Sequence, residues 1–160
     1  MANTYPVVIR EIVSHNEADY RFGYKASAAV NNGLLVALDA PLTGHRDVWT
    51  VKASITAATD EMWIVTGVEL MYEAGKTLGD YTNAAGKPFR VERITAGGTY
   101  AVSVDGIADS ASIAVGDDIT AASTGKLGVA GENATVLGTV VDVYTRGGIK
   151  FAAIRFTPAA

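Results

Sequence analysis

At its C-terminus the chain reads Thr139-Val140-Val141-Asp142-Val143-Tyr144-Thr145-Arg146-Gly147-Gly148-Ile149-Lys150-Phe151-Ala152-Ala153-Ile154-Arg155-Phe156. Residues 139–144 and 149–156 are rich in β-branched and aromatic side chains, which favour extended backbone. The intervening residues 145–148 end in paired glycines, and glycine accepts the positive φ angles that a tight hairpin turn requires. The segment therefore predicts two antiparallel strands joined by a short turn.

Alternation with a period of two extends through much of the remaining chain. Residues 49–55 and 100–105 alternate between apolar and polar side chains, which indicates strands with one buried face. Further β-branched or aromatic runs cover residues 7–13, 20–24, 34–39, 62–70 and 89–94. Glycine turn signals separate these runs, as is typical of a barrel or sandwich. We predict an all-β fold: a small β-barrel or sandwich of short antiparallel strands, with a C-terminal β-hairpin and little helix.

Two stretches, residues 26–30 and 68–81, could be mistaken for helices. Gly75 and Gly79 each disfavour helix by roughly 1 kcal/mol relative to alanine, so we expect at most a turn or two of helix there. We predict instead a long loop over residues 73–87. No linker rich in serine and proline divides the chain. Residues 1–160 are therefore expected to form a single β domain, with residues 1–5 as a flexible N-terminal arm.

The composition argues against several classes of protein. The 160 residues include no cysteine, which excludes disulfide frameworks, thiolate zinc sites and cysteine nucleophiles. The net charge of −4 argues against a protein that neutralises nucleic-acid phosphates. No run of about 18 apolar residues is present, and the first residues lack the basic and apolar regions of a secretory signal. We expect no nucleic-acid partner, no membrane insertion and no secretion.

Candidate catalytic and metal-binding groups are few. Residues 45–47, His-Arg-Asp, could bring a carboxylate near an imidazole, but no Gly-x-Ser-x-Gly elbow supplies a nucleophile, so a solvated loop is the simpler interpretation. His15, Glu17 and Asp19 would share one face of a strand and could hold a divalent ion, although a polar hairpin tip explains them as well. Asp-rich residues 117–118 suit an ordinary turn. We predict no catalytic residue, no metal, no cofactor and no enzymatic activity.

The aromatic residues divide into expected core residues and expected contact residues. The core is predicted to contain Trp49, Trp63, Phe22, Phe89, Phe151 and Phe156. Tyrosine favours interfaces, so a contact surface is an alternative for Tyr20, Tyr24, Tyr72 and Tyr81. For Tyr72 and Tyr81, which flank a glycine-rich loop, the core and the interface remain equal alternatives.

Four segments, taken in order, carry a resemblance to a known family. An Ala-Val-x-x-Gly-x-Leu-Val corner lies within residues 29–36, and Trp-Ile-Val-Thr-Gly-Val follows at residues 63–68. A loop at residues 81–90 precedes an Ala-Val-Gly-Asp segment at residues 114–117 and then the closing hairpin. In layout and composition, over most of its length, the chain resembles the small capsid decoration proteins of tailed bacteriophages, also called cement or head-stabilising proteins.

The resemblance implies a structural function in a virion. Proteins of this family are mostly β, are often trimers, and sit on the outside of the capsid at local symmetry axes, where they reinforce neighbouring subunits. It implies a homotrimer on the capsid exterior, made in the host cytoplasm, with the major capsid protein as partner. The family has no catalytic residues to transfer. From the chain itself, we expect the arm and the long loop to make the contacts, through Asn3, Thr4, Tyr5, Tyr72 and Tyr81.

Two other functions remain as alternatives. A β-barrel module that binds a glycan or another small ligand would place exposed aromatic and amide side chains around one concavity. An enzyme on a β scaffold would instead need converging polar groups with perturbed ionisation.

Overall fold

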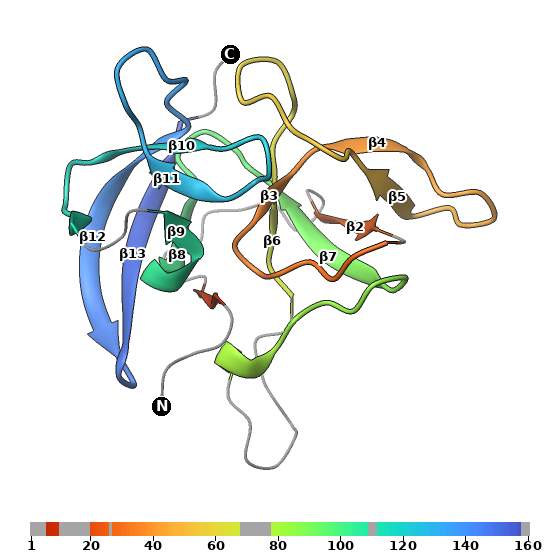
Figure 1. Cartoon of the computed structure of the whole chain (residues 1–160), viewed down its shortest axis with the longest axis horizontal. Coiled ribbons are helices and arrows are strands. Elements are labelled where there is room, and N and C mark those ends of the chain that lie inside the picture. Colours follow the sequence, from red (N-terminus) through yellow and green to blue (C-terminus); the bar gives the residue numbers. More distant parts are fainter. Residues whose placement is uncertain (1–5, 10–19, 26, 68–77, 109–111, 158–160) are drawn as a thin grey trace.

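The computed structural model describes residues 6–9, 20–25, 27–67, 78–108 and 112–157, which form two β-sheets that pack side by side (Figure 1). Among the described residues, helix is confined to short 3₁₀ turns, two of which, Leu78–Asp80 and Val104–Gly106, lie wholly within them. The strands are β1 Val8–Ile9, β2 Tyr20–Tyr24, β3 Leu35–Val36, β4 Leu38–Pro41, β5 Val48–Val51, β6 Trp63–Val65, β7 Pro88–Arg93, β8 Thr99–Ser103, β9 Ile107–Ala108, β10 Asp118–Ala121, β11 Leu127–Val129, β12 Gly138–Arg146 and β13 Ile149–Phe156. The all-β prediction is confirmed.

The first sheet is built around the predicted C-terminal hairpin. Its strand order is β1-β8-β13-β12-β10-β11-β9, so the two strands of the hairpin are central. Gly147 and Gly148 have φ angles of 59° and 81°, the left-handed region that a tight hairpin turn uses. A register shift between Val140 and Asp142 marks a β-bulge in β12. The hairpin prediction is confirmed, and β12 continues two residues beyond the predicted Tyr144, to Arg146.

The second sheet curls until its two edge strands are neighbours in sequence. Its order is β3-β6-β7-β2-β5-β4, and Ala37 alone separates β3 from β4. The predicted strand over residues 34–39 is therefore two strands, the first paired with β6 and the second with β5. This bend makes the sheet barrel-like, and its interior holds the buried side chains Val30, Val36, Trp63, Val65, Phe89 and Val91.

Two parallel pairings correct the prediction that all strands are antiparallel. β2 pairs in parallel with β5, and β9 pairs in parallel with β11. Both pairs join strands that are not consecutive in the chain, and only such strands have a connection long enough to reverse direction twice. Periodicity indicates that a segment is a strand but does not indicate its partner.

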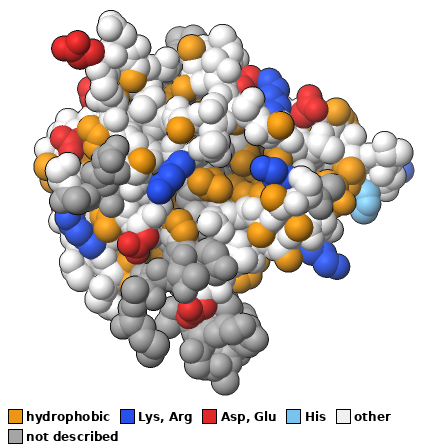
Figure 2. Space-filling view, in the orientation of Figure 1, with side chains coloured by type: hydrophobic (Ala, Val, Ile, Leu, Met, Phe, Trp, Pro, Cys, Tyr) orange, Lys and Arg blue, Asp and Glu red, His pale blue; other side chains and the backbone are white. Residues whose placement is uncertain are grey.

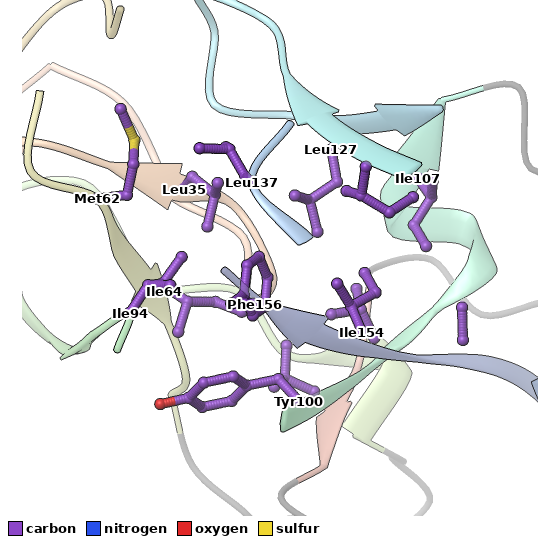
Figure 3. Packing of buried hydrophobic residues seen from close by; sticks show 14 of the residues in the cluster. Leu35, Met62, Ile64, Ile94, Tyr100, Ile107, Leu127, Leu137, Ile154 and Phe156 are labelled. Atoms are coloured by element: carbon purple, nitrogen blue, oxygen red, sulfur yellow. The ribbon is translucent and has the colours of Figure 1, made fainter. Parts of the chain in front are cut away.

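The main core lies between the two sheets (Figure 3). Leu35, Ile64 and Ile94 come from the curled sheet and its continuation, and they pack in one cluster with side chains of the first sheet such as Ile154 and Phe156. Full burial of each such side chain stabilises the fold by roughly 1.5–3 kcal/mol. The predicted core positions of Trp63, Phe89, Phe151 and Phe156 are confirmed by their burial.

One buried carboxylate bridges the two sheets. Glu92 on β7 is 2% exposed, and its Oε2 accepts a hydrogen bond from the Tyr100 hydroxyl of β8 at 3.3 Å. Its Oε1 accepts a hydrogen bond from Thr66 Oγ1 at 3.1 Å and lies 3.3 Å from Arg90 Nη2. A buried carboxylate is tolerated only when it is paired in this way.

Removal of the Glu92 carboxylate should destabilise the fold. Glu92→Ala leaves the Tyr100 and Thr66 hydroxyls buried without this acceptor, and we expect a loss of about 3 kcal/mol in the free energy of unfolding. Glu92→Gln keeps an acceptor oxygen of similar size and should lose about 1 kcal/mol. Urea unfolding measures both, with the exposed Glu132→Ala as the control. Equal losses for Glu92→Ala and Glu132→Ala would contradict this structural role.

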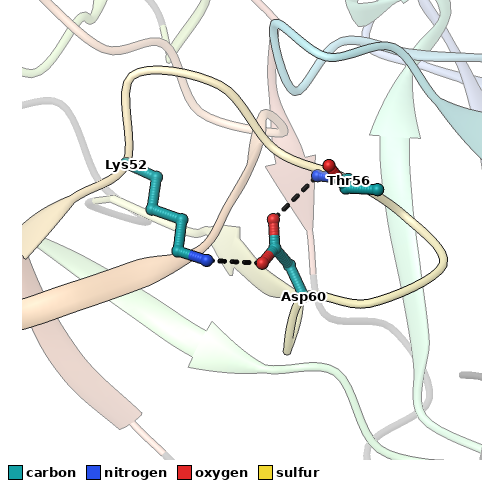
Figure 4. A network of polar contacts seen from close by, with 3 residues as sticks. All are labelled: Lys52, Thr56 and Asp60. Atoms are coloured by element: carbon teal, nitrogen blue, oxygen red, sulfur yellow. Dashed lines mark hydrogen bonds and ion pairs between the residues drawn. The ribbon is translucent and has the colours of Figure 1, made fainter.

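A polar clip closes the loop that follows β5 (Figure 4). The Lys52 ammonium donates to Asp60 Oδ1 at 2.5 Å, and the Thr56 backbone N–H donates to Asp60 Oδ2 at 2.7 Å. The hydrogen bond from Lys52, then the one from Thr56, lower the pKa of Asp60 below its ordinary value of 3.8. The ionised carboxylate therefore stabilises the folded chain at neutral pH.

This clip should make stability depend on acid pH. Because the folded pKa of Asp60 is below the unfolded pKa, the stabilisation is complete above pH of about 4 and is lost as the pH falls through the folded value. The stability gap between wild type and Asp60→Asn, measured by urea unfolding at several pH values, should be widest at pH 7 and close in acid. It should be smaller throughout in a Lys52→Met background. A gap that is constant with pH would exclude the clip as its cause.

Candidate functional site

An open cleft of about 560 Å³ lies where β2 and β5 begin, at one end of the curled sheet. Among the described residues, two short segments line it, the start of β2 and the loop that leads into β5. The lining residues are Tyr20, Arg21, Phe22, Arg46, Asp47 and Trp49. Three aromatic and three charged residues thus line this cleft, whose volume is within the range of roughly 300–1,000 Å³ typical of small-molecule sites.

The parallel pairing of β2 with β5 creates this cleft. Phe22 is in register with Val48, and Gly23 is in register with Trp49, so the beginnings of both strands lie at the same end of the sheet. An antiparallel pair would have placed the beginning of one strand beside the end of the other. Residues 20–22 and 46–49 therefore meet although more than twenty residues separate them in the chain.

The aromatic side chains of β2 are held in a defined arrangement. The Tyr20 and Phe22 rings meet edge to face, with centroids 6.0 Å apart and planes at 88°. The Arg90 guanidinium lies over the Tyr20 ring, 5.1 Å from its centroid, in a cation–π contact. Because Arg90 also contacts the buried Glu92, a polar chain runs from the interior to the rim of the cleft.

The charged groups of the cleft differ in what they already bind. Arg21 Nη1 donates to the Tyr20 carbonyl oxygen at 2.9 Å, which fixes this guanidinium against its own strand. Arg46 and Asp47 are exposed, and neither forms a hydrogen bond or ion pair through its side chain with the residues that the structure describes. The cleft thus presents one guanidinium and one carboxylate that are available to a ligand.

The predicted core positions of Phe22 and Trp49 are wrong. Phe22 is 38% exposed, and Trp49 is half-buried at the cleft. Strand β5 spans only Val48–Val51, and within it Val48 rather than Trp49 is the buried residue, so the predicted alternation over residues 49–55 also fails. The missed signal was the alternation Tyr20-Arg21-Phe22-Gly23-Tyr24, which puts three aromatic side chains on one face of a five-residue strand.

Most of the other predicted contact residues lie outside the described part of the chain: Asn3, Thr4, Tyr5 and Tyr72. The metal candidates His15, Glu17 and Asp19 also lie outside it. Tyr81 is half-buried, and its hydroxyl donates to Asn83 Oδ1 at 3.3 Å. Asn83 is itself buried and donates through Nδ2 to the Val30 carbonyl oxygen at 2.8 Å. Tyr81 therefore supports the described end of the predicted loop, and its contact with a partner stays a prediction.

The remaining polar candidates have local structural contacts. Asp117 Oδ2 accepts a hydrogen bond from the Ala114 backbone N–H at 2.8 Å, and Asp118 Oδ1 accepts one from Thr139 Oγ1 at 3.0 Å, as expected of turn and strand-end residues. Over the described ranges, no group of three or more acidic or histidine side chains could hold a metal ion. No helix in the part that the structure describes is long and apolar enough to cross a membrane.

Exposed valines lie on or beside strands β10, β11 and β12 of the first sheet. Four exposed valines are found there, namely Val115, Val129, Val136 and Val141. The segments that carry them are joined by backbone hydrogen bonds, from Gly116 N–H to the Val140 oxygen at 2.8 Å and from Leu137 N–H to the Ile119 oxygen at 2.7 Å. Val129 is in register with Ile119. Charged side chains of both signs are dispersed over the face shown in Figure 2.

No protein-family model, no curated protein and no solved structure matches this chain. The functional proposals therefore rest on the cleft and on the four exposed valines, which together are called the valine surface.

The floor beside the cleft depends on a glycine. Gly23 stands in register between Trp49 of β5 and Phe89 of β7. A Cβ at Gly23 would lie 2.7 Å from Phe89 Cε2 and 3.2 Å from Val51 Cγ1. The Phe89 ring therefore occupies the space that a side chain on β2 would need.

Gly23→Ala should destabilise the chain although alanine is usually the better strand residue. Overpacking against Phe89 is expected to cost about 2 kcal/mol in the free energy of unfolding. Gly128→Ala on β11 is the matched control, because its Cβ would meet only Ala108 Cβ, at an ordinary 3.6 Å. We expect this control to be neutral or slightly stabilising. Urea unfolding of both variants checks the expectation, which fails if the two behave alike.

Proposed function

We propose that the chain is a non-enzymatic structural protein of a bacteriophage virion. It binds the outside of the assembled capsid as a homotrimer, bridges neighbouring copies of the major capsid protein, and thereby stabilises the shell. It is made in the host cytoplasm and resides on the capsid exterior. The sequence resemblance motivates this proposal, and the exposed valines of the first sheet support it.

The valine surface is suited to docking on another protein. Four β-branched apolar side chains stand on or beside strands that a network of backbone hydrogen bonds holds together. Valine loses little side-chain freedom when a partner covers it, and removal of its apolar surface from water contributes about 25 cal/mol per Å². Val115 is 62% exposed, so most of its surface is available for this burial.

The stabilising mechanism is thermodynamic linkage. A protein that binds the assembled shell but not the dissociated subunits shifts the equilibrium toward the shell by mass action. In a symmetric capsid the same contact is repeated at every equivalent position, so a modest affinity per copy adds up over the particle. Such a protein needs complementary surfaces and a rigid scaffold.

Binding to capsids tests the proposal directly. The wild-type protein should sediment with expanded tailed-phage capsids that lack their own decoration protein, and it should raise the temperature at which packaged DNA is released. Val115→Asp or Val141→Asp should weaken binding about tenfold, which corresponds to about 1.4 kcal/mol, since a charge would be buried in the contact. The control is Ala96→Asp, which adds the same charge at an exposed turn outside the valine surface and should bind as the wild type does.

One result would overturn the proposal: failure to sediment with any capsid tested, together with a folded monomer by light scattering. Equal binding by Val115→Asp and wild type would exclude the valine surface as the contact.

A further inference from the structure

We propose that the cleft between β2 and β5 is a saccharide-binding site, and that it accepts a neutral oligosaccharide without cleaving it. This activity is separate from capsid binding, because the cleft lies on the curled sheet whereas the valine surface lies on the first sheet. The inference is carried by the kinds of side chain that converge in the cleft and by the way they are held.

The aromatic rings match the apolar faces of sugar rings. A pyranose ring presents C–H groups on its faces, and these carry a small positive charge that is attracted to the negative face of an aromatic ring. Tyr20 is 42% exposed and Phe22 is 38% exposed, so both present uncovered ring surface at the start of β2. Trp49, which is half-buried, adds a third aromatic residue to the lining from the adjacent strand.

The polar groups match sugar hydroxyls. A hydroxyl both donates and accepts hydrogen bonds, and neighbouring hydroxyls are best bound by a guanidinium that donates beside a carboxylate that accepts. Arg46 and Asp47 supply this combination from consecutive positions at the cleft. Arg46 and Asp47 offset each other's charge, and a neutral ligand can use both, whereas an anion would be repelled by the Asp47 carboxylate. Arg21 keeps its charge but already donates through Nη1 to the Tyr20 carbonyl oxygen.

The cleft is also preorganised, which lowers the entropic cost of binding. Arg90 is fixed between the buried Glu92 carboxylate and the Tyr20 ring, and Tyr20 in turn packs edge to face on Phe22. The volume of about 560 Å³ leaves room for more than one sugar ring. An open cleft of this kind, with exposed rings and few fixed donors, is expected to bind at about millimolar Kd.

The test uses the full chain and three neutral trisaccharides of different linkage and substitution: maltotriose, cellotriose and triacetylchitotriose. Binding is followed through the two indole N–H signals in ¹H–¹⁵N NMR spectra. At least one sugar should shift the Trp49 signal at millimolar concentration. The Trp63 signal should stay in place, because Trp63 is 6% exposed inside the curled sheet. The sugar should be recovered intact.

Matched variants connect the signal to the cleft. Phe22→Ala should weaken binding about tenfold, and Asp47→Asn should weaken it also, since both remove a ligand contact at an exposed position that the fold does not need. The control is Val129→Ala, an apolar truncation at a position of nearly equal exposure, 37%, on the other sheet. It should bind sugar as the wild type does. Urea unfolding should show that Phe22→Ala remains folded.

Each other outcome contradicts the proposal. The saccharide site is excluded if none of the three sugars shifts Trp49 at tens of millimolar, or if Phe22→Ala binds as well as Val129→Ala. If a peptide of glutamate and proline shifts the Trp49 signal and the sugars do not, the cleft binds a protein segment instead of a saccharide. Cleavage of a trisaccharide into smaller sugars would show that the site is catalytic and would contradict binding without cleavage. Phe22→Ala should still sediment with capsids and Val115→Asp should still bind sugar, so failure of one proposal is distinguishable from failure of the other.

Discussion

The buried carboxylate of Glu92 is the constraint that links the two sheets and, through them, the surface. A carboxylate that is 2% exposed must find hydrogen-bond donors within the protein, because water cannot reach it. Tyr100 supplies one donor from the first sheet, and Arg90 supplies another from the same strand of the curled sheet. The hydrogen bond between Tyr100 and Glu92 therefore favours the arrangement of the sheets in which these two side chains meet. The same requirement fixes the Arg90 guanidinium, which then holds the Tyr20 ring at the rim of the cleft.

A second constraint is the closure of the curled sheet. The bend at Ala37 places β3 at one edge of the sheet and β4 at the other. The two edge strands are therefore consecutive in the chain. The bend is braced from the first sheet, since the Leu35 backbone N–H donates to the Gly125 carbonyl oxygen at 2.8 Å. Gly125 has a φ of 84°, and a Cβ there would meet the Leu35 carbonyl oxygen, so glycine is required for this close approach.

Local signals in the sequence were enough for the class of fold but not for the site. The hairpin at Gly147 and Gly148 was predictable because the turn, the two strands and their pairing are all local in the chain. The parallel pairing of β2 with β5 was not, because nothing in residues 20–24 specifies a partner beyond residue 45. Trp49 shows the consequence. The alternation around Trp49 predicts that its side chain is buried. Its partner on β2 is Gly23, however, and the Phe89 ring already fills the space beside Gly23, so Trp49 stays half-buried.

The exposure of Tyr20 and Phe22 is where the sequence departs from what stability alone favours. Each ring leaves about two fifths of its surface in water, although threonine or lysine at either position would suit an outward-facing strand and would expose less apolar surface. Departures from local consistency of this kind are expected at functional sites, where binding compensates for the cost. The exposed Tyr20 ring is also held in place, because Arg90 lies over it and contacts the buried Glu92 carboxylate. A surface that only had to remain soluble would need neither the exposed rings nor their buried support, and this pairing of features favours a ligand in the cleft over chance exposure.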